Sequence, residues 1–259
     1  MAHANEFSFG LLPPAFAFVM SCLGSFLGLR CASRARACTG MARTRWLLLA
    51  ALAIGATGIW VMHNIALLGF SIPGQTILYD VPTSILSALV AVAVVFAALM
   101  ITGVGGHRFL PLALGGILIG CGVLISMDYV GMAAMLMPDT IEYNIWVVLL
   151  SALIAVVAAT FSLWAALRLR GIGSTLVASV VMGAGISGMH YTAMTAMRFV
   201  PVRETAGMMG GATTGEFVLP LVLIISVLTF VLTTSVALSP SEDEIRADAA
   251  ISERLARRL

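Results

Sequence analysis

Three short stretches of the chain place a methionine beside an imidazole or a carboxylate within apolar surroundings. Aligned on the methionine, they read Met62-His63-Asn64, Met127-Asp128-Tyr129 and Met189-His190-Tyr191, and 65 and 62 residues separate the copies. Five positions after the aligned methionines come Leu67, Met132 and Met194. Ionisable side chains inside apolar membrane segments usually face an interior cavity and mark function. The spacing therefore indicates an internal repeat whose copies contribute to one site.

The side chains of the repeats favour a soft metal. His190 and Met194 are four residues apart, as are Asp128 and Met132, so each pair shares one face of a helix. Imidazole nitrogen combined with thioether sulfur favours copper, Cu(I) in particular, over magnesium or calcium. The carboxylate of Asp128 would add a hard oxygen that suits Cu(II) better. The mixture leaves the redox state of the metal open.

The composition predicts an all-α integral membrane protein. Of the 259 residues, 60% are hydrophobic and only 10% are charged, whereas soluble proteins are about 25% charged. A hydrocarbon core takes roughly 20 helical residues to cross, and lipid requires every backbone polar group to be satisfied internally. Seven transmembrane helices are expected, at Phe9–Leu29, Trp46–Phe70, Thr83–Val104, Phe109–Leu136, Ile145–Leu167, Ser174–Met197 and Phe217–Leu238.

Charge sidedness predicts the orientation of these helices. The basic residues Arg30, Arg34, Arg36, Arg43, Arg45, Arg108, Arg168 and Arg170 fall between alternate helices, in loops without acids. The opposite loops contain Asp80, Asp139, Glu142, Glu204 and Glu216. The positive-inside rule places the N-terminus outside and the C-terminus in the cytoplasm. We expect a multi-pass protein of the cell (inner or plasma) membrane, embedded in the lipid bilayer, without a cleaved signal peptide.

The chain divides into a membrane domain at residues 1–238 and a short cytoplasmic amphipathic tail at residues 239–259. Within the domain we expect one leading helix followed by three parallel two-helix repeats. At about 1.5 Å per residue, His63, Asp128 and His190 lie roughly 25, 28 and 24 Å beyond the start of their helices. This common depth, close to the extracytoplasmic face, would let three repeats around a pseudo-threefold axis aim their side chains at one centre.

The motif Met189-His190-Tyr191-Thr192 with its two antecedents resembles the MHYT domain, a bacterial integral membrane sensor module. The resemblance covers most of the chain and implies seven membrane helices, a copper site near the outer face, and a diatomic gas such as O2, CO or NO as the signal. The ligand residues that it implies are Met62, His63, Met127, Met132, Met189, His190 and Met194. Our predicted metal site comprises Met62, His63, Asp128, Met132, Met189, His190 and Met194, supported by Met127, Asn64, Tyr129 and Tyr191.

Three positions depart from the family pattern. Asn64 replaces the tyrosine of the first motif, Leu67 replaces a methionine, and Asp128 stands where histidine is usual. Asp128 could bind the metal, orient a histidine through a hydrogen bond, or show that the second copy has lost the site. Many relatives join this module to cyclic-di-GMP or kinase domains, and no such domain is expected here.

The predicted function is that of a membrane sensor that passes a metal or gas signal to a separate cytoplasmic signalling protein. One alternative is an electron-transfer protein with a haem between His63 and His190. Another is a copper transport or acceptor protein, although the inner half of the helices lacks a matching Met/His layer. No catalytic pair or nucleotide motif is visible, so we expect no enzyme. Nucleic-acid binding is not expected, because the basic residues follow membrane topology.

Overall fold

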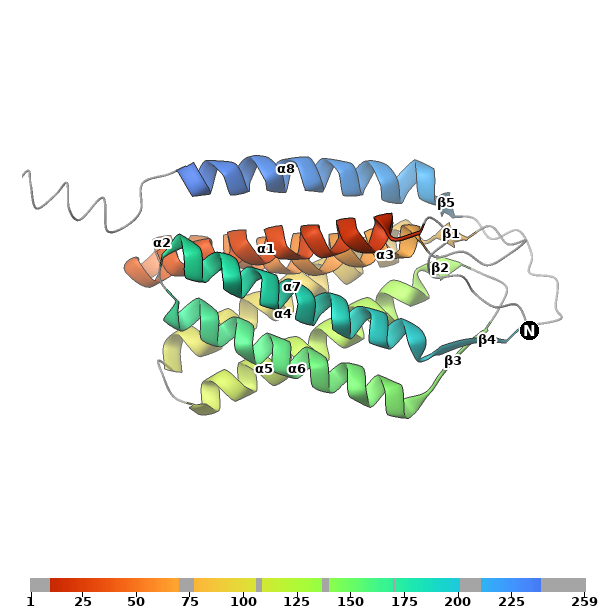
Figure 1. The fold of residues 1–259 in the computed structure, drawn as a ribbon, viewed down its shortest axis with the longest axis horizontal. Helices are drawn as coiled ribbons and strands as arrows, with labels where there is room; N and C mark the ends of the chain where they lie inside the picture. The colour runs from red at the N-terminus through yellow and green to blue at the C-terminus, as the bar shows by residue number, and fades with distance from the viewer. Residues whose placement is uncertain are drawn as a thin grey trace, which may run out of the picture.

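The computed structural model describes residues 10–69, 77–105, 109–136, 140–169, 171–200 and 211–238. Helices dominate this part of the chain and run back and forth along one long axis (Figure 1). They are α1 (Leu12–Ala37), α2 (Gly40–Ala51), η1 (Leu52–Val61), α3 (Met62–Leu68), α4 (Val81–Gly105), α5 (Phe109–Val123), η2 (Leu124–Gly131), α6 (Ile145–Arg168), α7 (Ile172–Thr195), η3 (Thr214–Val218) and α8 (Leu219–Leu238), where η denotes π-helix. The predicted tail, residues 239–259, lies outside the described residues.

The apolar helices make this an all-α, multi-pass membrane protein. Five of them are long and apolar enough to cross a bilayer, namely Leu12–Ala37, Gly40–Leu68, Val81–Gly103, Ile145–Arg168 and Ile172–Thr195. Phe109–Val123 and Leu219–Leu232 are shorter apolar helices. Each lies within a predicted span, and α5 continues without a break into η2. The seven-span topology and the orientation of the termini stay predictions.

The first predicted helix boundary is wrong, because α1 does not end at Leu29 but continues to Ala37. The guanidinium of Arg36 explains the extension, since it donates hydrogen bonds to the backbone carbonyls of Ala166 and Leu169 at the end of α6. Those carbonyls belong to the last turn of a helix and have no partner within it. The predicted basic loop is therefore mostly helical, and only Cys38 and Thr39 separate α1 from α2.

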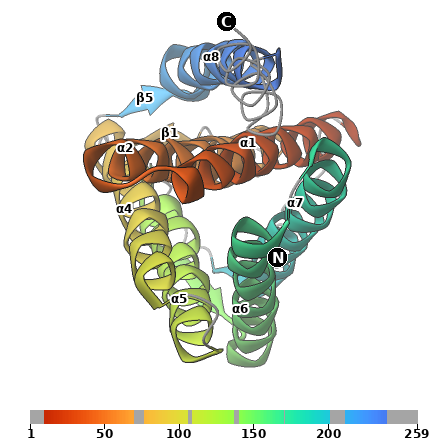
Figure 2. The same ribbon diagram turned by 90° about the vertical axis from the view of Figure 1, so that its left-hand side faces the viewer.

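Six helical rods form a closed ring, which Figure 2 shows end-on as a triangle. Its three sides are α1 with the continuous α2–η1–α3 rod, α4 with α5, and α6 with α7. The first helix is thus part of a pair, and α8 lies outside the ring against α1 and η1. The predicted order of one leading helix followed by three two-helix repeats in the sequence stays a prediction, because pairing in space does not define the repeat unit.

Glycines at the helix contacts let the ring close. A Cβ at Gly24 of α1 would lie 2.4 Å from the backbone nitrogen of Gly58 in η1. A Cβ at Gly120 of α5 would similarly lie 2.7 Å from the backbone nitrogen of Val156 in α6. Membrane helices associate through such small residues because lipid supplies no hydrophobic force between them. The backbones of neighbouring rods therefore touch directly at these points.

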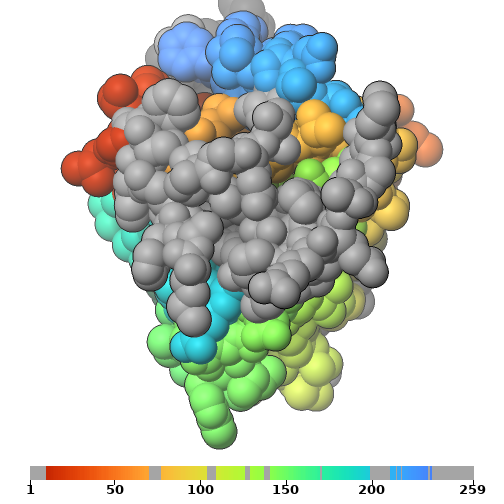
Figure 3. Space-filling model, turned by 90° about the vertical axis from the view of Figure 1, so that its right-hand side faces the viewer, coloured from red at the N-terminus to blue at the C-terminus, as the bar shows by residue number. Residues whose placement is uncertain are grey.

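Short strands gather at one end of the ring (Figure 1). The central strand β1 (Leu78–Tyr79) pairs antiparallel with both β2 (Met135–Leu136) and β5 (Ala212–Thr213). A second sheet pairs β3 (Thr140–Tyr143) with β4 (Met197–Val200), with Thr140 opposite Val200 and Tyr143 opposite Met197. These strands were not predicted. Figure 3 faces this end, with residues of α8 in blue along the top and those of α6 in green towards the bottom.

A hydrogen bond and a groove mark the contact between α8 and the ring. The hydroxyls of Thr57 in η1 and Thr229 in α8 are 2.8 Å apart and buried. Beside them runs an apolar groove of about 430 Å³ whose walls include Leu27, Trp46 and Leu228.

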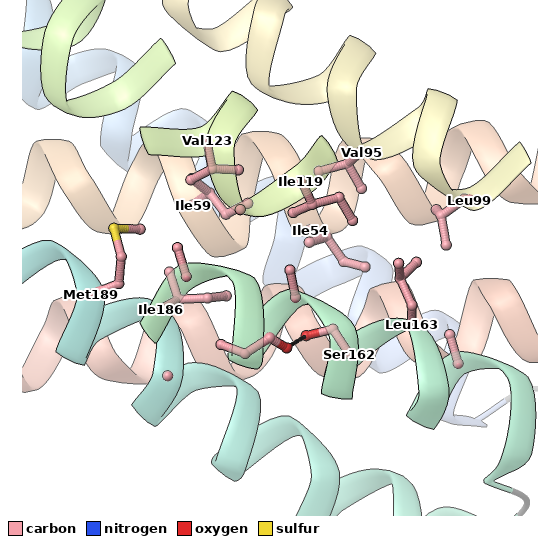
Figure 4. Close-up of a pocket in the computed structure, with 16 residues that line it drawn as sticks. Ile54, Ile59, Val95, Leu99, Ile119, Val123, Ser162, Leu163, Ile186 and Met189 are labelled. Atoms are coloured by element: carbon pink, nitrogen blue, oxygen red, sulfur yellow. Dashed lines mark hydrogen bonds between the residues drawn. The ribbon is translucent and has the colours of Figure 1, made fainter. Parts of the chain in front are cut away.

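The core of the ring is also apolar and is centred on the ring axis. A cavity of about 40 Å³ lies there, and aliphatic side chains form most of its lining (Figure 4).

Candidate metal centre

His63 and His190 meet inside the ring at the strand end. Their Nδ1 atoms are 3.3 Å apart, and the ring centroids are 4.7 Å apart at an interplanar angle of 72°. Exposed fractions of 2% and 1% show that both imidazoles are fully buried. The first and third repeats, 127 residues apart in sequence, therefore contribute one side chain each to the same point. The predicted common depth of these two histidines is confirmed.

A π-helix positions His63. The wide segment η1 ends at Val61, and His63 lies in the first turn of α3 that follows. The indole nitrogen of Trp60, in η1, donates to the carbonyl of Ser84 and to the hydroxyl of Ser87, both on α4. Asn64 donates its side-chain amide to the carbonyl of Trp60 at 2.8 Å. Asn64 thus stabilises the π-to-α transition, and its predicted supporting role at a metal site stays a prediction.

The contact between the two Nδ1 atoms leaves Nε2 of His63 without a hydrogen-bond partner among the described residues. In a neutral imidazole one ring nitrogen donates and the other accepts. If His63 donates from Nδ1, its Nε2 needs a donor, and if it accepts there, its Nε2–H needs an acceptor. Nε2 of His63 is buried and has no hydrogen-bond partner among the described residues. A buried polar atom without a partner is costly, and it is where a ligand absent from a protein-only structure would be expected.

Four predicted methionines are buried, and three of them line two cavities. Met62, Met132, Met189 and Met194 are all buried. Met189, one residue before His190, lines the axial cavity at its left-hand end in Figure 4, as do Ile59 and Val123. Met132 and Met194 line a second cavity of about 10 Å³. The sulfur-bearing residues of the second and third repeats are therefore brought together, as their spacing predicted.

The second repeat is described only in part. Its backbone forms η2, a second π-helix that contains the Met127-Asp128-Tyr129 motif. The side chains of Met127 and Asp128 lie outside the described residues, so the three interpretations of Asp128 remain open. Tyr129 lines the cavity beside Met132, and its ring centroid lies 5.3 Å from that of Tyr143 of β3, with the two rings tilted against each other. The ring of Tyr191 lies 5.5 Å from that of His190.

Sequence analysis missed several residues around this centre. Tyr143 and Met197 line the cavity of Met132 and Met194, and both come from strands that pair with each other. Ser151 of α6 lines the same cavity with an unpartnered, buried hydroxyl, and Ser187 of α7 has another. Met197 offered a signal, since it falls three residues after Met194. Tyr143 and Ser151 belong to no repeat motif and could not be found from spacing.

These residues fit a soft metal better than a hard one. Within the described part of the chain, no three His, Cys, Asp or Glu side chains cluster as a metal site. A soft centre would need only the two imidazoles with thioether sulfur, a ligand set suited to copper. Metal–nitrogen bonds of about 2.0 Å let one ion span up to about 4 Å between two nitrogens. The 3.3 Å separation of the Nδ1 atoms is compatible with a shared ion.

The fold and this centre define a multi-pass helical membrane protein with a repeated motif whose first and third copies converge. The family model MHYT, described as a bacterial signalling protein N-terminal repeat, matches residues 57–115 and 120–179. The chain belongs to this MHYT family of signalling proteins, as its sequence motif predicted. The two matches cover the first and second motifs, and the third, at Met189, lies beyond them.

Three relatives carry signalling names. The chain is 36% identical over 237 residues to the bifunctional diguanylate cyclase/cyclic di-GMP phosphodiesterase MucR of Pseudomonas aeruginosa, covering 90% of this chain and 34% of that protein. It is 35% identical to the cyclic di-GMP phosphodiesterase NbdA of the same organism, over 71% of this chain and 24% of that protein. The signaling protein YkoW of Bacillus subtilis is 28% identical over 70% of this chain and 23% of its own length.

The chain spans about a third or less of the relatives it matches. What it shares with them is the MHYT region, a membrane sensor region, and the catalytic activities in the names of those relatives are theirs. No solved structure matches the chain.

Proposed function

We propose that this sensor module holds one copper ion at His63 and His190 and responds to a diatomic gas or to redox state. The observation that carries the proposal is the pair of buried imidazoles from the first and third repeats, with Nδ1 atoms 3.3 Å apart. The 3.3 Å separation of the two Nδ1 atoms supports it further, because one ion with metal–nitrogen bonds of about 2.0 Å could bind both. The signalling names of the relatives support the sensor class.

The remaining ligands would come from the neighbouring methionines. Met62 and Met189 each precede a histidine of the pair, and Met194 shares a helix face with His190. Met132 adjoins Met194 at the small cavity, and Asp128 would complete the second repeat. When bound, copper would supply a redox-active centre that can take up a small diatomic ligand. The burial of the imidazoles would exclude water and anionic competitors from that centre.

A change at this centre can reach the rest of the molecule through the ring. His63 and His190 lie on different sides of the triangle, so any change in their separation moves one helical pair against another. Packed helix interfaces tend to switch between discrete arrangements. We propose that such a shift passes to a separate cytoplasmic signalling protein, or to further domains such as those of the relatives.

Metal analysis of the purified full chain tests the proposal. After reconstitution with copper and desalting, we expect about one copper per chain by mass spectrometry, lost in His63→Ala/His190→Ala. Ser179→Ala is a matched control, because Ser179 is buried on the helix that carries His190, eleven residues before it, and its hydroxyl donates to the carbonyl of Leu176. Circular dichroism and size-exclusion chromatography check the fold, and His190→Asn replaces the double variant if that fails to fold.

Two results would contradict the copper site. One is a wild-type chain that retains no copper after reconstitution, and the other is a folded double variant that retains as much as wild type. A Soret band would favour the haem alternative instead. The geometry offers that alternative little support, because the two imidazoles contact each other directly and leave no space for a macrocycle between them.

A further inference from the structure

Another cavity, which has polar as well as apolar walls, lies on the ring axis at the end opposite the strands. Its volume is about 290 Å³, and its walls come from the end of α1, the start of α2, and the far ends of α4 and α6. Figure 2 views the ring from this end. Its polar lining residues include Arg36, Cys38, Thr39 and Arg43. The cavity is separate from the histidine pair and has no part in the proposed metal centre.

Two arginines give this cavity a positive charge. Arg36 is held in place by its hydrogen bonds to the carbonyl ends of α6, which do not neutralise it. Arg43 is half-buried, and its guanidinium packs on Gly103 of α4, where a Cβ would lie 2.5 Å from it. Arg43 has no hydrogen-bond or ion-pair partner among the described residues. The cavity thus contains a guanidinium whose donors are free for a ligand.

Further donors point to an anion rather than to a neutral ligand. Thr39 precedes α2 but makes no side-chain capping bond, which leaves the first amides of that helix without a capping partner. Free amides at a helix N-terminus bind phosphate and other anions. Three described carboxylates lie beside the strands, at the other end of the ring. They belong to Asp80, Glu142 and Glu216. No described acid lines the cavity to compete for the arginines.

We infer that this cavity binds a phosphate-type anion, either a free phosphate or the phosphate of a lipid headgroup. The planar guanidinium of arginine matches phosphate with paired hydrogen bonds, which a spherical ion such as chloride cannot use. The volume of about 290 Å³ admits a phosphate group with room to spare. Leu99, Leu163 and Ala166 line both this cavity and the axial cavity below Met189. An anion at this end therefore contacts the same side chains that enclose the other cavity.

Cys38 provides a direct probe, because it lines the cavity. The full chain in maltoside detergent, which contains no phosphate, is alkylated with neutral iodoacetamide, and modification is measured cysteine by cysteine through peptide mass spectrometry. We expect inorganic phosphate to slow alkylation of Cys38 relative to chloride at equal ionic strength. Alkylation of Cys121, which is exposed on α5, should not respond.

Substitution of the free arginine makes the test specific. Arg43→Gln should raise the phosphate concentration needed for half-protection by about tenfold or more, since a hydrogen bond to a charged group contributes about 1.5–3 kcal/mol. Arg45→Gln is the matched control, because Arg45 is exposed on the same helix, contacts Met41 and does not line the cavity. Each variant is compared with itself without phosphate, which cancels any change in thiol reactivity.

Lipid nanodiscs separate the two sources of phosphate. Protection of Cys38 by phosphatidylglycerol discs without added phosphate, lost in Arg43→Gln, assigns the site to a lipid headgroup. Protection by added phosphate alone assigns it to a free anion. The inference is overturned if neither arm gives protection that depends on Arg43, or if chloride protects as well as phosphate does.

Discussion

The histidine pair concentrates the chemistry of this protein in two side chains that have few partners. An imidazole buried in apolar surroundings is stable only when its nitrogens are bonded, and the Nδ1–Nδ1 contact satisfies one nitrogen on each ring. Nε2 of His63 is left over. Apolar side chains in place of these two histidines would fill the same space at a lower free-energy cost of burial. The retention of polar groups at this point therefore argues for binding rather than packing.

Methionine substitutions separate a ligand from a packing residue. Met189 and Met182 are both buried on α7, but only Met189 adjoins a histidine of the pair. Leucine conserves volume and costs less than about 1.5 kcal/mol in a core, while it removes the sulfur. We expect Met189→Leu to weaken copper binding by about tenfold or more, the scale on which lost metal-site interactions act, and Met182→Leu to leave it unchanged. Competition with a Cu(I) chelator measures both, and equal affinities would remove Met189 from the ligand set.

Asp80 gives a pH-dependent prediction at the strand end. Its carboxylate accepts hydrogen bonds from the hydroxyl and the backbone amide of Thr83, which hold the pKa of Asp80 below its ordinary value of 3.8. A lowered pKa in the folded state contributes stability at neutral pH, and this stability is lost as the pH falls through that pKa. Asp80→Ala should therefore lower the Tm by a few degrees at pH 7 and by less below pH 4.

Thermal unfolding of both proteins between pH 3 and pH 7 checks the Asp80 prediction. Glu142→Ala, which removes an exposed carboxylate at the same end, is the control. A wild-type advantage that grows as the solution is acidified would contradict it.

Close helix contacts determine how the elements reach the site. The contact between Gly24 of α1 and Gly58 of η1 holds the first side of the triangle together, five residues before His63 along the same rod. The π-helices η1 and η2 both lie at or just before a motif. Such wide turns are rare and often occur at functional sites, because they change the direction in which the following side chains point.

A glycine substitution tests this packing. Gly24→Ala would place its Cβ 2.4 Å from the backbone nitrogen of Gly58, which cannot move aside as a side chain could. We expect a loss of about 1–3 kcal/mol in the free energy of unfolding, the usual cost of overpacking. Gly173→Ala on α7, where nothing lies within 4 Å of the new Cβ, should be neutral or stabilising by about 0.5–1 kcal/mol. Unfolding in detergent followed by circular dichroism measures both, and equal stability of the two variants would contradict the prediction.

The elements differ in how well sequence could predict them. Long apolar runs predicted the helical rods. The repeat spacing predicted that His63 and His190 lie at one level, because a constant rise per residue gives equal depths on parallel helices. The π-helices could not be predicted, since one wider turn barely changes an apolar pattern. Strands such as β1 contain only two residues between turn-forming segments, too few for a period. The place of α1 in the ring depends on contacts between distant residues.

At the scale of the whole molecule, charge and chemistry divide between the two ends. Arg36, Arg43 and their cavity lie at one end, and the strands, the histidine pair and the described carboxylates of Asp80, Glu142 and Glu216 lie at the other. In a membrane this division is also an orientation, because arginines are retained on the cytoplasmic side. With the predicted orientation, the proposed metal centre would face the outside and the inferred anion cavity would face the cytoplasm, with the apolar axial cavity between them. A signal at the centre would thus cross the bilayer within a single ring.

Cysteine labelling from one side of the membrane tests this orientation and the span count together. Met41 at the start of α2 and Glu142 on β3 are both exposed, and three rods separate them. An odd number of crossings puts them on opposite sides. With a membrane-impermeant maleimide on intact cells, we expect Glu142→Cys to be labelled, and Met41→Cys to be labelled only after the membrane is opened. The opposite pattern would invert the topology. Labelling of both variants from the same side would mean that one of the three rods does not cross the membrane. That rod would be α5 with η2, because its α-helical part is the only one of the three that is short for a span.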